Sequence, residues 1–69
     1  SRVQVHFKPW NDGESDFMVC EIDVTIQGHS LFVHRRDGTY DGATRKALAE
    51  LHQKMDEYLS KTGITDSNR

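Results

Sequence analysis

The chain has 69 residues, a net charge of -2 at pH 7 and a mean hydropathy of -0.75, which suits one small domain. Its 9 Lys and Arg residues against 11 Asp and Glu exclude strong non-specific attraction to nucleic acid, so any RNA contact requires a local basic patch. The single cysteine, Cys20, excludes an internal disulfide and favours a reducing, cytoplasmic setting. No apolar run approaches the length of a membrane span, so no membrane partner is expected.

The first predicted element is a strand over residues 2–8. Its apolar residues occupy every second position, as in a strand with one buried face: Val3, Val5 and Phe7. Pro9 is expected to end this strand, because proline cannot donate to the ladder. The polar residues that follow, up to position 16, predict a loop that begins with Trp10. Trp10 either folds over the edge of the core or stays exposed, where it stacks on a base or anchors a partner.

The next two predicted strands form a hairpin. Residues 17–27 show the clearest alternation in the chain, with one apolar face: Met18, Cys20, Ile22, Val24 and Ile26. A turn at Gly28 and His29 is expected next, since glycine readily adopts the positive φ that tight hairpin turns require. The third strand then places Leu31 and Val33 inward and ends at Asp37 and Gly38.

One long helix is expected to begin at Tyr40. Thr39 is a suitable N-cap, and Asp41 places a negative charge in the first turn. Apolar residues recur at helical spacing and predict a stripe that covers the inward faces of all three strands: Tyr40, Ala43, Ala47, Leu48, Leu51, Met55, Tyr58 and Leu59. Gly63 and Ile64 predict a Schellman ending, followed by a disordered tail over residues 65–69.

These elements predict a single α+β domain over residues 1–69, a two-layer β-β-β-α sandwich with an antiparallel sheet. Phe17, Val19 and Phe32 lie on the sheet face away from the helix, where nothing in the chain is expected to cover them. They are either ordinary exposed apolar residues or, together with Trp10, a partner surface. Three strands also leave two open edges, so either a homodimer through the open face or an edge, or contact with a missing segment, is expected.

Four stretches carry a family resemblance: residues 2–7, 20–26, 28–29 and the helix over 39–59. In order and spacing they resemble the ribosome hibernation factors, also described as sigma-54 modulation proteins or ribosome-associated inhibitors. The resemblance implies a fold like that of double-stranded-RNA-binding domains, and a cytoplasmic, non-enzymatic factor that contacts rRNA of the small subunit and modulates translation. It covers nearly all of this chain but only the later part of the family domain, whose first strand and first helix are expected to be absent.

The basic residues are the candidate RNA contacts, as a patch around the end of the third strand and the start of the helix. The candidate set is His34, Arg35, Arg36, Arg45, Lys46, Lys54 and Lys61. The helix lysines are alternatively explained as stabilising the helix, because Glu50 and Lys54, like Glu57 and Lys61, are spaced as favourable i,i+4 pairs. The chain departs from the basic run of the family helix at Glu50 and Gln53.

No residue pattern indicates catalysis or a bound cofactor. The four histidines lack the spacing of a metal site, and Cys20 has no neighbouring helix N-terminus to activate its thiol. Glu21 and Asp23 stand two apart on a strand without a nucleophile or base beside them. We therefore expect no enzyme activity, no metal and no cofactor. The alternative to the ribosome-binding hypothesis is a small protein-interaction module, dimerising or antitoxin-like, without RNA binding. A free-standing double-stranded-RNA binder is a third hypothesis.

Overall fold

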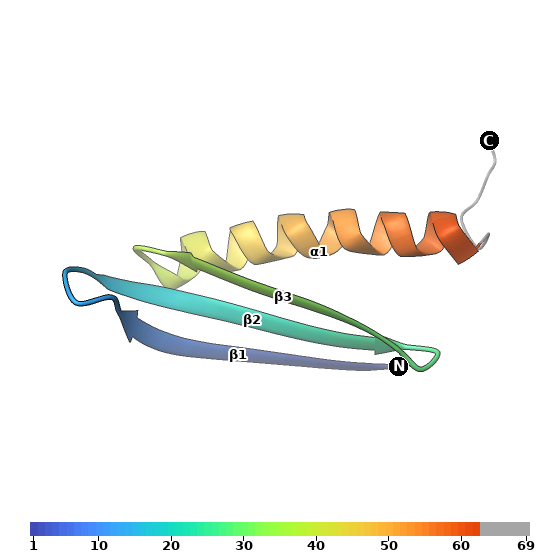
Figure 1. The fold of residues 1–69 in the computed structure, drawn as a ribbon, viewed down its shortest axis with the longest axis horizontal. Coiled ribbons are helices and arrows are strands. Elements are labelled where there is room, and N and C mark those ends of the chain that lie inside the picture. The colour runs from blue at the N-terminus through green and yellow to red at the C-terminus, as the bar shows by residue number, and fades with distance from the viewer. Residues whose placement is uncertain (63–69) are drawn as a thin grey trace.

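The chain folds into a three-stranded antiparallel sheet with one long helix on one face (Figure 1). The computed structural model describes residues 1–62. Its elements are β1 (Arg2–Asn11), β2 (Asp16–Ile26), β3 (His29–Asp37) and α1 (Tyr40–Thr62), with strand order β1-β2-β3. The predicted α+β sandwich is therefore confirmed. The predicted Schellman ending at Gly63 and Ile64 and the predicted disordered tail lie outside the described residues.

β1 is longer than the sequence pattern predicts. It continues through Pro9 and Trp10 to Asn11, so the prediction that Pro9 ends the strand was wrong. β1 is an edge strand, and an edge strand tolerates proline because no second neighbouring strand needs a hydrogen bond from the N–H that proline lacks. Trp10 consequently lies in the sheet opposite Phe17, and the loop that was predicted to contain it shortens to residues 12–15.

The turn between β2 and β3 is the two-residue connection Gln27 and Gly28. Both residues have positive φ, 51° and 79°, as expected for a tight hairpin turn whose twist matches that of the strands. The role predicted for Gly28 is confirmed, whereas His29 already belongs to β3. The two-residue turn sets the register in which Ile22 lies opposite Val33.

The core lies between α1 and the two strands β2 and β3. Leu31 and Val33 point inward as predicted, and Cys20 is fully buried. Ala43 and Ala47 are also fully buried, because their small side chains let the helix approach the sheet closely. The core cluster is Cys20, Ile22, Val24, Leu31, Val33, Ala43 and Ala47, with Ile26, Leu51, Met55 and Tyr58 packed against it.

The helix does not cover β1, contrary to the sequence-based expectation. Val3, Val5 and Phe7 do point to the helix side of the sheet, since Val5 pairs with the inward Ile22, but they are 62%, 47% and 52% exposed. α1 packs on β3 and β2, and β1 lies farthest from it (Figure 1). A helix about 10 Å across spans roughly two strands spaced about 4.8 Å apart, so a single helix leaves the third strand open.

The flank of α1 that faces β1 is apolar and also exposed. Leu48 is 52% exposed and Tyr40 is 41% exposed, although both were predicted to lie in the buried stripe. Tyr40 reaches β1 only as far as an edge-to-face ring contact with Phe7, at 5.5 Å between centroids. We call the surface formed by Val3, Val5, Phe7, Tyr40 and Leu48 the uncovered stripe.

The start of α1 agrees with the predicted cap. The hydroxyl of Thr39 accepts a hydrogen bond from the Gly42 N–H at 3.0 Å. Asp37 supports this cap, because its carboxylate accepts the Thr39 N–H at 3.3 Å and pairs with the Lys46 ammonium at 2.8 Å. The hydrogen bond from Lys46, and then that from the Thr39 N–H, hold the pKa of the Asp37 carboxyl below its ordinary value of 3.8.

Asp37→Asn is expected to lower thermal stability at neutral pH and to flatten its decline in acid. A carboxyl with a depressed folded-state pKa stabilises the fold above its unfolded pKa and loses that contribution as pH falls through the folded value, which here lies below 3.8. Thermal melts between about pH 7 and about pH 2 measure both effects. Asp56→Asn, at an exposed site on α1, controls for charge. Coincident curves for Asp37→Asn and the parent would show that the carboxylate contributes nothing to the cap.

Candidate nucleic-acid interface

The sheet face opposite α1 gathers aromatic and basic side chains from all three strands. Residues that are paired across strands point to the same face, so the register of the sheet defines this surface. We call it the helix-free face. It consists of Arg2, Gln4, His6, Lys8 and Trp10 from β1, Phe17, Val19, Glu21, Asp23 and Thr25 from β2, and Ser30, Phe32, His34 and Arg36 from β3.

One end of the helix-free face carries a cluster of Trp10, Phe17 and Arg36. The two rings pack at 5.9 Å between centroids, with 35° between their planes. The Arg36 guanidinium lies over both, 4.4 Å from the Trp10 ring centroid and 4.7 Å from that of Phe17. Trp10 nevertheless remains 43% exposed. The cluster therefore presents an aromatic surface with a cation beside it.

Arg36 makes no ion pair with a carboxylate within residues 1–62. Asp12 lies within electrostatic range of it, but that carboxylate is engaged by the backbone N–H groups of Ser15 and Glu14, each at 2.9 Å. These backbone bonds chiefly, and Arg36 to a lesser extent, lower the pKa of Asp12. Arg36 thus keeps its hydrogen-bonding capacity for another acceptor.

Val19 lies on the helix-free face but is only 1% exposed. The expectation that nothing in the chain covers it was wrong. Its cross-strand neighbours Lys8 and Arg36 flank it on the same face, and Arg36 in turn lies over Phe17. Of the predicted partner residues, Trp10 and Phe32 are well exposed, Phe17 is half-buried and Val19 is not accessible.

The middle of the helix-free face is a row of paired charges. The Glu21 carboxylate lies 3.1 Å from the Lys8 ammonium and 3.6 Å from His34 Nε2, and His6 stands opposite Glu21 on β1. Glu21 is therefore already engaged by basic groups. The face as a whole carries three full cations, Arg2, Lys8 and Arg36, against two carboxylates.

Arg35 and Arg36 point to opposite faces of the sheet, because consecutive strand residues alternate. Arg35 reaches toward α1 and pairs with Glu50 at 3.3 Å. Glu50 also pairs with Lys54 at 3.8 Å, which fits the predicted i,i+4 contact. Lys54 donates in addition to the Phe32 carbonyl at 3.1 Å. The predicted basic patch is therefore divided between two surfaces.

The basic residues at the start of α1 are likewise engaged. Arg45 pairs with Asp41 one turn earlier, and Lys46 pairs with Asp37. Of the candidate basic residues on the helix, only Lys61 makes no ion pair among the described residues. The ion pairs of Lys46 and Lys54 therefore support the interpretation that the helix lysines stabilise the fold.

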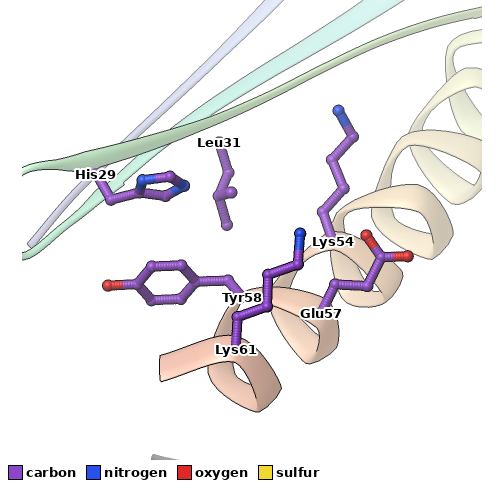
Figure 2. A pocket seen from close by; sticks show the side chains of 6 residues that line it. All are labelled: His29, Leu31, Lys54, Glu57, Tyr58 and Lys61. Carbon is purple, nitrogen blue, oxygen red and sulfur yellow. The ribbon is translucent and has the colours of Figure 1, made fainter. Parts of the chain in front are cut away.

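Three shallow hollows flank these surfaces in the described part of the chain, and one of them, of about 440 Å³, lies beside Arg35, Glu50 and Lys54. Figure 2 shows another, of about 450 Å³, between the last turns of α1 and the start of β3. The His29 imidazole stacks on the Tyr58 ring there at 4.7 Å. Glu57 and Lys61 also line this hollow, but the i,i+4 ion pair predicted between them is not formed. The third hollow, of about 500 Å³, lies at the opposite end of β3. It is lined by Trp10, His34 and Arg36 from the helix-free face and by Arg35, which points to the other face and pairs with Glu50.

Arg2, His6 and Lys8 belong to this surface but were absent from the candidate set. Their place on the face opposite the apolar residues of β1 follows from the alternation of the strand, so the signal was present in the sequence. The alternation within one strand does not determine that Lys8 lies beside Glu21 or that Trp10 lies beside Arg36, because these contacts depend on which strands pair and in which register.

In the part of the chain that the structure describes, no three His, Cys, Asp or Glu side chains are placed to hold a metal ion. The same residues include no helix with the length and apolarity to cross a bilayer. Comparison with protein-family models, curated proteins and solved structures finds no match to this chain.

Proposed function

We propose that this chain is a non-enzymatic RNA-binding domain that associates with the ribosome through the helix-free face of its sheet. The β-β-β-α order agrees with the fold that the hibernation-factor resemblance implies, and that resemblance names small-subunit rRNA as the target. The observation that carries the proposal is the position of Arg36 over Trp10 and Phe17, free of any ion pair within residues 1–62.

The charge distribution supports this face over the helix. A phosphate must compete with any carboxylate that already holds a cation, and the described basic residues of α1 other than Lys61 have such carboxylates. On the helix-free face Lys8 is held in the same way by Glu21, but Arg2 and Arg36 make no ion pair within residues 1–62, although the whole chain has a net charge of -2. RNA approaching this protein is therefore attracted locally and not by the overall field.

Co-sedimentation with ribosomes at low and high salt tests the proposal. We expect binding to the small subunit that weakens steeply with salt, because phosphate contacts release counterions. Arg36→Glu is expected to lower the affinity roughly 10- to 100-fold, as expected for losing a charge-assisted hydrogen bond. Arg45→Glu, on the other surface and equally basic, serves as the matched control and is expected to bind like the parent.

Two outcomes would contradict this assignment. An absence of binding at low salt would remove the ribosome from consideration. An equal loss of affinity in Arg36→Glu and Arg45→Glu would place the contact on the helix or show that it depends only on net charge.

A second candidate function, a dimerising protein-interaction module, is favoured by the uncovered stripe and the open edge of β1. The proposed occupant is a second copy of this chain, paired β1 to β1. In the antiparallel register that sets Val5 opposite Phe7 of the other copy, the two apolar rows become adjacent. The same register sets Arg2 beside Trp10 of the other copy, a favourable cation–aromatic pair.

A further inference from the structure

We infer that the helix-free face binds unpaired bases, so that its ligand is single-stranded RNA and not duplex RNA. This inference rests on the proposed function and specifies the class of RNA. It starts from the exposed aromatic rings on the face, Trp10 at 43% and Phe32 at 49% exposure. Exposed rings on the surface of a sheet offer stacking surfaces, which every unpaired base can use regardless of its identity.

The two rings mark the ends of a track along the sheet. Trp10 is paired with Phe17, and Phe32 is paired with Asp23, six positions further along β2. At about 3.3 Å per residue, the ends lie roughly 20 Å apart. This length corresponds to about six nucleotides at the stacked spacing of about 3.4 Å, and to fewer when the bases are spread.

Groups suited to a nucleic-acid backbone line the track between the rings. Arg36 provides a cation that no carboxylate within residues 1–62 holds, Lys8 provides a second cation that is shared with Glu21, and His6 and His34 provide ring nitrogens. Glu21, in the centre, is engaged by Lys8 and His34 and therefore opposes phosphate less than a free carboxylate. The hollow of about 500 Å³ beside Trp10, partly lined by Arg36, adds room for a base or phosphate at that end.

Duplex RNA does not use such a surface. Its bases are stacked inside the helix, and proteins read it through the 2′-hydroxyls and phosphates of its minor groove. Exposed Trp10 and Phe32 would find no base face to stack on, whereas an unpaired loop or strand end presents bases to both. The arrangement of rings and cations thus selects single strands.

The fluorescence of Trp10 tests the inference directly, because this is the only tryptophan in the chain. Hexauridylate and hexaadenylate RNA are titrated into the protein, beside a short RNA duplex. We expect saturable quenching with the single strands and none with the duplex. Trp10→Phe keeps a stacking ring without the signal, and its binding is followed with a fluorescein-labelled oligonucleotide. We expect it to retain binding.

Two phenylalanines provide a matched pair of variants on opposite faces. Phe32→Ala is expected to weaken single-strand binding roughly 5- to 150-fold, as measured for loss of one base stack. Phe7→Ala removes a ring of similar exposure, 52%, from the uncovered stripe and is expected to bind like the parent. Circular dichroism verifies that each variant is folded before its affinity is compared.

The outcomes separate this inference from the proposed function. Equal affinity for duplex and single strands without quenching, while ribosome binding persists, would overturn base stacking and leave the proposed function standing. Quenching by single strands without ribosome binding would support the inference and remove the ribosome as the target. Absence of both would overturn both.

Discussion

Ile22→Ala is expected to cost about 2–5 kcal/mol of unfolding free energy, a large part of the stability of this domain. Ile22 is 3% exposed and lies in the core cluster beneath α1. A chain of 69 residues is expected to have roughly 3–10 kcal/mol of stability in total. Urea denaturation followed by circular dichroism measures the loss of unfolding free energy. The Ile22→Ala variant is expected to be partly unfolded even without urea if its loss is near the upper value.

Val5→Ala is the matched control for this experiment. Val5 is the β1 partner of Ile22 and points to the same side of the sheet, but it is 47% exposed. In an isolated copy its truncation is expected to cost less than about 0.5 kcal/mol. A cost for Val5→Ala as large as that of Ile22→Ala would show that β1 is covered in solution.

Val5→Lys tests whether a second copy provides that cover. If β1 pairs with its own copy, the substitution places a charge in the centre of the interface and is expected to raise the dissociation constant roughly 100-fold or more. Sedimentation equilibrium over a range of protein concentrations measures it. The parent is expected to approach twice the chain mass at high concentration, and the Val5→Lys variant to remain a monomer.

Ala49→Lys is the control, because Ala49 is exposed on α1 and outside the uncovered stripe. It is expected to dimerise like the parent. A parent protein that is monomeric at every concentration would remove the second copy as the occupant of the stripe. A dimer that survives Val5→Lys would place the interface elsewhere on the molecule.

The features that sequence analysis predicted correctly depend on local signals. The alternation in β2 and β3 identified the inward residues, since a strand has only two faces. Thr39 and Tyr40 marked the start of α1, because capping involves a few consecutive residues. Gly28 marked the hairpin turn for the same reason.

The features that sequence analysis missed depend on distances between elements. Alternation placed Val5 on the correct face, but how many strands one helix covers depends on the width of the helix and its position over the sheet. The burial of Val19 required cross-strand neighbours that no local pattern specifies. The separation of Arg35 from Arg36 was implicit in strand geometry, whereas the pairing of Arg35 with Glu50 arises only when α1 folds back.

The hydrogen bond from Lys54 to the Phe32 carbonyl makes the two edges of the sheet unequal. An edge-to-edge contact between β1 of one molecule and β3 of the next would repeat without limit and build a fibre. Lys54 occupies a main-chain acceptor of β3 and sets a charged side chain beside that outer strand, whereas β1 is interrupted only at Pro9, which lacks one N–H donor. β3 is therefore the less accessible edge for the addition of a strand, whereas pairing of β1 with β1 of a second molecule would close on itself and end after two molecules.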